Sequence, residues 1–192
     1  MTNMIKWGVL SLFFGLVTLS CGDDKEDPKP VSPLAGTWQL SPTAGSLAVG
    51  PSASDLSWWS LSSGDVTARA CLMDDEYILN EDGTFQNSVG TSTWLEGWQG
   101  ASPDGCGTPV APHNGSVTGT WTAGTSTIAI VGNGCYMGLA KVHNTGENGA
   151  PADDTIVYNY VLSSDKNTLE LTIKGWLPDV PDATWYFRFV RK

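Results

Sequence analysis

The feature that most constrains the fold of this chain is a series of short segments in which apolar and polar residues alternate, with no sustained helical period. Alternation places successive side chains on opposite faces, which is typical of a half-buried β-strand. In residues 168–174, Leu169, Leu171 and Ile173 alternate with polar residues. The other predicted strands are Gly36–Leu40, Val117–Thr122, Thr127–Val131, Tyr136–Val142, Ile156–Leu162 and Trp185–Phe189, with a hairpin over Tyr77–Phe85. The sequence therefore predicts an all-β fold.

Eight or nine antiparallel strands joined by hairpins favour an up-and-down barrel, because closing the sheet removes its exposed edges. Glycine and proline are frequent, with 22 and 11 residues, and they supply turns. In the Tyr77–Phe85 hairpin, Asp82-Gly83 is the pair that permits the positive φ of a tight turn. A β-sandwich is the alternative architecture.

A targeting segment precedes the predicted barrel. Lys6, an apolar run over Trp7–Leu19 and small residues before Cys21 follow the order of a secretory signal peptide. The run has about 13 residues, whereas a membrane-spanning helix needs roughly 20. We expect a lipoprotein signal peptide over residues 1–20, a lipid-modified Cys21, a disordered tether over 21–33 and a barrel domain over 34–192. The alternative is ordinary cleavage after Thr18-Leu19-Ser20, which would release a soluble protein.

The charge of the chain excludes some partners. It has 20 acidic and 10 basic residues, and its net charge of −10 becomes −11 when Lys6 leaves with the signal. Such a surface repels phosphate backbones and anionic lipid, so we expect neither nucleic-acid binding nor electrostatic docking to membranes. Neutral and cationic ligands remain open.

Three cysteines follow Cys21, and an exported protein can keep a disulfide. We favour a Cys71–Cys106 bond, because both residues lie in turn-rich sequence, whereas Cys135 lies in a predicted strand. A zinc site is disfavoured, because no Cys-x-x-Cys spacing is present and only His113 and His143 could assist. We predict no metal and no cofactor.

Two long polar stretches, Ser41–Ala70 and Gly90–Gly115, separate predicted strands, and loops of this length are either functional or disordered. They contain four tryptophans. Two adjacent indoles in an extended chain point to opposite faces, so one of Trp58 and Trp59 is expected to be exposed. Sugars stack on such rings while carboxylates and amides bind their hydroxyls. The candidate ligand-binding residues are Trp58, Trp59, Trp94, Trp98, Asp55, Glu96 and Gln99. The alternative is that these tryptophans form a satellite core, whereas Trp38, Trp121 and Trp185 lie on strands and are assigned to packing.

Other polar clusters carry weaker signals. Asp74-Asp75-Glu76, with Glu81 and Asp82, could bind Ca²⁺, but the spacing does not match a calcium loop and a solvated charged face is favoured. No Gly-x-Ser-x-Gly elbow or His-Glu-x-x-His motif is present, so we predict no catalytic residues and no enzyme activity.

Three motifs in order along the chain resemble the lipocalin-like lipoproteins of Bacteroidetes: Leu34-Ala-Gly-Thr-Trp38, Leu79-Asn-Glu-Asp-Gly-Thr-Phe85 and the closing strand Trp185–Lys192. The resemblance implies a lipocalin-like barrel in which Trp38 packs beneath a basic side chain of the last strand, Arg188 or Arg191. The acidic residues after Cys21 resemble signals for export to the outer face of the outer membrane. The stretch from Ser57-Trp-Trp-Ser60 to His113 is similar to modules found beside β-glucan-degrading enzymes.

These observations predict a non-catalytic lipoprotein, anchored in the outer membrane and exposed at the cell surface, that binds a glycan such as a β-glucan through loop tryptophans. One alternative is a lipocalin-type carrier of a small apolar ligand, with an aliphatic cavity inside the barrel. Another is a structural subunit of an outer-membrane uptake complex, which would have transporter components as partners.

Overall fold

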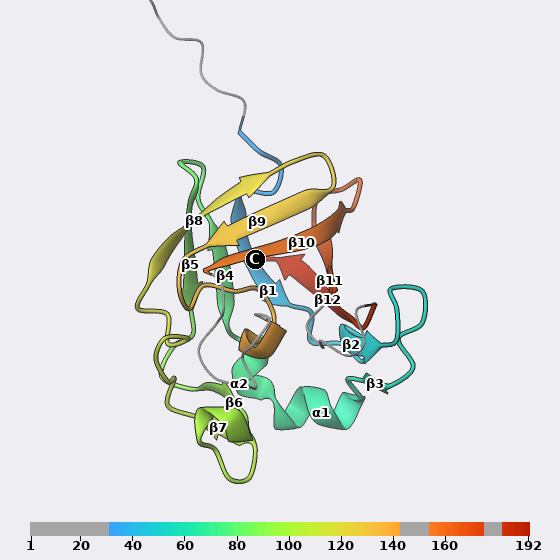
Figure 1. The fold of residues 1–192 in the computed structure, drawn as a ribbon, viewed down its shortest axis with the longest axis vertical. Helices are drawn as coiled ribbons and strands as arrows, with labels where there is room; N and C mark the ends of the chain where they lie inside the picture. The colour runs from blue at the N-terminus through green and yellow to red at the C-terminus, as the bar shows by residue number, and fades with distance from the viewer. Residues whose placement is uncertain (1–30, 143–153, 175–181) are drawn as a thin grey trace, which may run out of the picture. The chain divides into compact units, whose positions relative to one another are not determined.

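The structure is a computed structural model that describes residues 31–142, 154–174 and 182–192 (Figure 1). The predicted signal peptide, Cys21 and residues 22–30 of the predicted tether lie outside these ranges. The described strands are β1 (Gly36–Leu40), β2 (Leu47–Gly50), β3 (Trp59–Ser60), β4 (Glu76–Leu79), β5 (Thr84–Ser88), β6 (Thr93–Leu95), β7 (Gly105–Gly107), β8 (Thr118–Ala123), β9 (Thr127–Val131), β10 (Thr155–Leu162), β11 (Thr168–Lys174) and β12 (Thr184–Arg191). The described helices are α1 (Ser63–Ala68), α2 (Ala70–Met73) and the 3-10 turns η1 (Gly97–Gln99) and η2 (Ala140–Val142). None of these helices is long and apolar enough to span a membrane.

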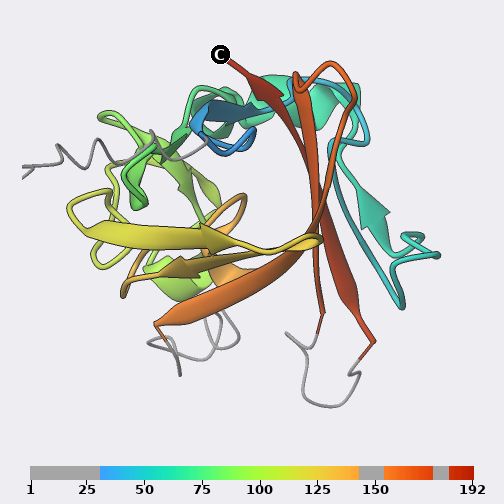
Figure 2. The ribbon, with the colours of Figure 1, turned by 90° about the horizontal axis from the view of Figure 1, so that it is seen from above.

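Eight strands form a closed antiparallel barrel whose neighbours in space follow the order of the chain (Figure 2). Their order is β1, β4, β5, β8, β9, β10, β11 and β12, and pairing of β1 with β12 closes the ring. The predicted alternation sets the burial, because Leu169, Leu171 and Ile173 of β11 are buried while the residues between them are partly exposed. The prediction of an all-β, up-and-down barrel is confirmed, and the β-sandwich alternative is wrong.

The stretch Ser41–Ala70, predicted to be a long loop, contains structure of its own. β2 pairs with the first half of β12, β3 pairs with β2, and α1 follows. β2 carries no alternation because all four of its residues are buried, and β3 is only two residues long. Neither strand has the periodic signal on which a strand prediction depends. This extension places Trp59 beside β12.

A segment that we call the plug, residues 134–140, lies inside the barrel, and all of its residues are buried. Side chains that point inward from the wall hold its backbone. The hydroxyl of Tyr77 on β4 donates to the carbonyl oxygen of Gly138 at 2.9 Å. The Asn87 amide on β5 donates to the carbonyl oxygen of Tyr136 at 2.8 Å, and the Met137 amide donates to the Tyr158 hydroxyl on β10 at 2.9 Å. The wall therefore satisfies plug groups that would otherwise be buried without partners.

The plug corrects the prediction of a strand over Tyr136–Val142. A short apolar run has no periodicity, so the strand was predicted from composition alone. In the structure, this run is irregular chain that ends in η2. Gly138 has a φ of +86°, and a Cβ there would lie 2.3 Å from the Phe187 ring. The prediction that Cys135 lies in a strand is also wrong, because Cys135 lies at the start of the plug as a buried free thiol. The apolar-carrier alternative, which requires an aliphatic cavity inside the barrel, stays a prediction.

The barrel end where β12 ends is closed by a basic side chain that lies over an indole of β1. The guanidinium of Arg191 lies 4.3 Å from the ring centre of Trp38, which is fully buried. Its nitrogens donate to the carbonyl oxygens of Ala35 and Pro33, both at 2.7 Å. Arg188, the other candidate, lies on the outward register of β12 and donates to Glu170 at 3.3 Å. Arg191 therefore occupies the position that the resemblance implied.

Gly36→Ala is expected to lower the free energy of unfolding by about 2–3 kcal/mol. Gly36 has a φ of +137°, which L side chains rarely adopt, and a Cβ there would lie 2.3 Å from Nη1 of Arg191. Gly90→Ala is the matched control, because Gly90 has a φ of +58° and no other atom within 4 Å of the new Cβ. We expect a loss of about 1 kcal/mol for the control. Urea unfolding measures both values, and equal losses would contradict the required close approach of Arg191.

Candidate functional site

An open cleft of about 320 Å³ combines aromatic rings with charged side chains. Parts of the chain that are distant in sequence form it: β2, β3, the corner between α1 and α2, the β6–β7 region, the end of the plug, η2 and β12. Its lining residues are Val49, Trp59, Arg69, Glu96, Asp104, Leu139, Lys141 and Trp185. A concave surface with aromatic walls and a few converging polar groups is the usual form of a small-ligand site.

The β2–β3 pairing positions Trp59. Trp59 is the partner of Val49 on β2, and both residues line the cleft. The adjacent Trp58, which precedes β3, does not line the cleft and remains 47% exposed. The prediction that only one of the two indoles could point inward is confirmed, and Trp59 is the one that lines the cleft.

Arg69 stands at the corner where α1 ends and α2 begins, and its backbone amide donates to the Asp65 carbonyl oxygen at 2.8 Å. Its guanidinium lies 4.1 Å from the ring centre of Trp94 and 5.1 Å from that of Trp59. Burial lowers the pKa of Arg69 from its usual value, and the charges of Glu96, Asp65 and Asp104 act in the opposite direction. Arg69 remains a cation at any physiological pH.

Glu96 is a buried carboxylate whose two oxygens are both engaged. Oε1 lies 2.8 Å from Nζ of Lys141, and Oε2 accepts from the indole nitrogen of Trp98 at 3.0 Å. The side chain of Gln99 accepts from the Glu96 backbone amide at 3.2 Å. The Lys141 ammonium also lies 5.2 Å from the ring centre of Trp185. These contacts fix the Glu96 and Lys141 head groups in one orientation.

Trp185 combines packing with a place in the cleft. It lies on β12 opposite Val49 of β2, and it is only 4% exposed. Its assignment to packing is correct, but the residue also lines the cleft beneath Lys141.

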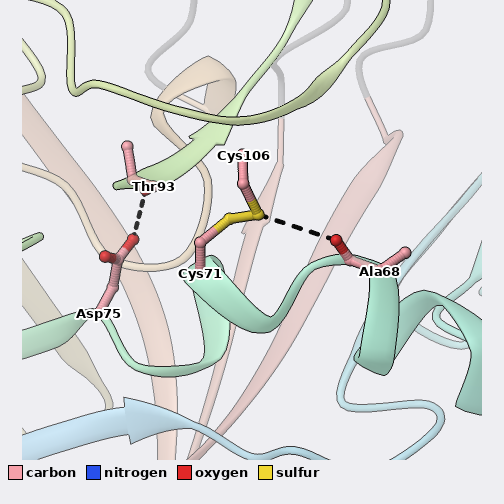
Figure 3. The surroundings of a disulfide bond; sticks show 5 residues. All are labelled: Ala68, Cys71, Asp75, Thr93 and Cys106. Carbon is pink, nitrogen blue, oxygen red and sulfur yellow. Dashed lines mark hydrogen bonds between the residues drawn. A yellow bond between two sulfur atoms is a disulfide. The ribbon is translucent and has the colours of Figure 1, made fainter. Parts of the chain in front are cut away.

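A disulfide between Cys71 on α2 and Cys106 on β7 joins two sides of the cleft region (Figure 3). The predicted pairing is confirmed. The Cys106 sulfur also lies 3.8 Å from the carbonyl oxygen of Ala68, the last residue of α1. Arg69 and Asp104 each precede a half-cystine by two residues, so the bond restrains both of these charged positions. Asp104 is further held because its Oδ1 accepts from the Gly97 amide at 2.9 Å.

A buried carboxyl lies near the disulfide, at Asp75 (Figure 3). The Thr93 hydroxyl donates to its Oδ2 at 2.6 Å, while Oδ1 has no hydrogen-bond partner among the described residues. Burial raises the pKa of Asp75 to about 7, with a smaller contribution from Asp74, and the Thr93 hydrogen bond opposes this rise. The prediction that the Asp74–Glu76 cluster is a solvated face is therefore wrong at its central residue, because the α2–β4 connection turns Asp75 inward.

The structure brings together some of the predicted ligand-binding residues and not others. Trp59 and Glu96 line the cleft. Trp94, Trp98 and Gln99 do not line it, but Trp94 contacts Arg69, and Trp98 and Gln99 contact Glu96. Trp58 and Asp55 do not line it. Asp55 is exposed and accepts from the Ser57 amide at 3.1 Å, a local turn contact.

Sequence reasoning missed Arg69, Asp104, Lys141, Val49 and Leu139. One signal was available, because Arg69 and Lys141 are the only basic residues between Lys29 and Lys166. In a chain with twice as many acidic as basic residues, isolated cations are unusual. The apolar lining residues carried no signal, because their pattern is that of any buried strand or core segment.

No family model and no curated protein matches the chain. Among solved structures, it is similar to an uncharacterized protein from Bacteroides eggerthii, with 10% sequence identity and a TM-score of 0.37. The similarity covers 83% of this chain and 99% of that one. Membership of the lipocalin-like lipoproteins therefore remains a prediction, and the function is argued from the cleft.

Proposed function

We propose that this protein is a non-catalytic glycan-binding lipoprotein, anchored through Cys21 at the outer membrane, and that the cleft is its sugar site. The observation that carries the proposal is the presence of aromatic rings and fixed polar groups in one cleft. Trp59 offers a partly exposed indole for stacking against the apolar face of a sugar ring, and Trp185 forms part of the wall. Asp104 and Arg69 supply an acceptor and donors for hydroxyl groups.

The contacts of Glu96 support binding rather than catalysis. Glycoside hydrolysis requires a carboxylic acid that protonates the leaving oxygen and a second carboxylate across the bond. Both oxygens of Glu96 already accept hydrogen bonds from cationic or indole donors. A carboxylate held in this way is suited to maintaining the geometry of the cleft.

Trp59→Ala is expected to weaken glycan binding by about two- to tenfold, because a lost stacking contact is worth roughly 0.5–1.5 kcal/mol. Trp58→Ala is the matched control, since it removes the neighbouring exposed indole, which does not line the cleft. Affinity electrophoresis against a panel of β-glucans and other polysaccharides measures retardation of the native protein and both variants. Circular dichroism checks that each variant is folded.

The native protein should be retarded by at least one polysaccharide, Trp58→Ala should behave like it, and Trp59→Ala should be retarded less. Lack of retardation on the whole panel would refute glycan binding. Equal loss in both variants would show that the cleft is not the site.

A further inference from the structure

The two cationic side chains of the central part of the chain meet in one cleft. Arg69 and Lys141 are the only basic residues between Lys29 and Lys166, and they are 72 positions apart in sequence. Both line the cleft with Trp59 and Trp185. The fold thus brings both cations into one cleft, beside the carboxylates of Glu96 and Asp104, on a protein of net charge −10.

The two cations differ in how they are neutralised. Lys141 forms an ion pair with Glu96 at 2.8 Å. Among the described residues, no carboxylate lies within ion-pair distance of the Arg69 guanidinium, and no side-chain or backbone oxygen accepts a hydrogen bond from it. The carboxylates that act on Arg69 at longer range have other partners. Glu96 is paired with Lys141 and Trp98, Asp65 accepts from Ser62, and Asp104 accepts from Gly97.

The contacts that Arg69 does make leave its donors free. A guanidinium packed on an aromatic ring uses its face, whereas its N–H groups lie in its plane. Trp94 and Trp59 hold that face, and the α1–α2 corner and the disulfide hold the backbone. Arg69 is therefore a pre-organised cation with up to five donors at the wall of a sugar-sized cleft.

We propose that the cleft selects a glycan that bears a carboxylate, such as a uronic acid, and that Arg69 binds this carboxylate. This inference rests on the proposed function and names its ligand class. The planar fork of a guanidinium matches the two oxygens of a carboxylate in a bidentate pair. The negative charge of the whole protein opposes dense polyanions, so the ligand is an otherwise neutral glycan with isolated uronic acid residues.

The test compares acidic oligosaccharides with their methyl esters, because esterification removes the charge and keeps the sugar. Oligosaccharides with a single glucuronic or galacturonic acid are titrated into the mature native protein by calorimetry. The acid is expected to bind at least about tenfold more tightly than its ester. In Arg69→Gln the acid should lose about 10- to 100-fold in affinity, the range for a charged hydrogen-bonded pair, and the ester about twofold or less. Arg69→Lys should restore only part of the affinity, because a lysine cannot form the bidentate pair.

Lys166→Gln is the matched control, since it removes one positive charge from an exposed turn outside the cleft lining. It should bind the acid as the native protein does. Equal affinity of the native protein for acid and ester would overturn carboxylate recognition while leaving glycan binding intact, and this comparison needs no variant. Binding of neither the acids nor any neutral polysaccharide would instead refute the proposed function.

Discussion

The double variant Cys71→Ala/Cys106→Ala is expected to have a free energy of unfolding about 4 kcal/mol lower than that of the native protein. The disulfide links residues with a sequence separation of 35. On the chain-entropy account, closing a loop of this length restricts the unfolded state and stabilises the folded one by that amount. Urea unfolding of the oxidised native protein and of the variant measures the difference.

The loss is expected to be concentrated around the cleft. The disulfide joins α2 to β7, whereas barrel closure depends on β1–β12 pairing and on the clamp of Arg191 over Trp38. Hydrogen exchange should therefore accelerate in residues 63–73 and 93–107 before it does so in β9 to β12. Reduction of the native protein should reproduce the variant, and the variant itself should not respond to reductant. A native protein whose unfolding is unchanged by reduction would contradict a stabilising disulfide.

The barrel was predictable because its strands carry a local signal. Residues 168–174 alternate, and the structure buries the same three apolar residues that the pattern selects. The hairpin between β4 and β5 has Gly83 at a φ of +86°, as the Asp-Gly pair predicts. The plug was not predictable in this way. Its apolar run is buried by contacts with Tyr77, Asn87 and Tyr158, which are distant in sequence and leave no periodic trace.

The site, like the barrel, was predictable only where its residues carry a local sequence signal. Tryptophans in irregular sequence indicated Trp59, and a nearby carboxylate indicated Glu96. The residue that most distinguishes the cleft, Arg69, lies in an unremarkable Ala-Arg-Ala sequence beside Cys71. Its importance comes from the two indoles that the β2–β3 extension and β6 place over it. Such an arrangement depends on tertiary contacts.

Net charge and local charge lead to different expectations for the ligand. The excess of acidic residues favours neutral or cationic partners, because the long-range field of the protein repels anions. At short range the field is set by individual groups, because at physiological salt the interactions between exposed charges more than about 8 Å apart are largely screened. Arg69 then dominates the region next to its own donors. An isolated carboxylate on a neutral glycan satisfies both conditions.

The second large effect concerns pH. As pH rises from about 4 to about 7, the free energy of unfolding of the native protein is expected to fall relative to that of the Asp75→Asn variant. Burial raises the pKa of Asp75 to about 7 from an ordinary value of 3.8. Below pH 4 the carboxyl is protonated in both folded and unfolded chains. Between these pH values the unfolded chain releases the proton while the folded chain keeps it, so unfolding becomes easier; above pH 7 both are ionised and the trend ends.

The expected size follows from the difference between the two pKa values, at about 1.4 kcal/mol for each pH unit between them, which gives about 4 kcal/mol. The amide of Asp75→Asn does not titrate, so any constant cost of the substitution cancels when the two proteins are compared across pH. Asp74→Asn is the control, because it neutralises the adjacent exposed carboxyl and removes only its smaller contribution to the pKa of Asp75, so it should retain most of the native pH dependence. Urea unfolding at several pH values from 4 to 8 measures all three proteins. If the native and Asp75→Asn curves ran parallel over this range, Asp75 would have to be ionised in the folded protein at low pH, and its burial beside Thr93 would not govern its titration.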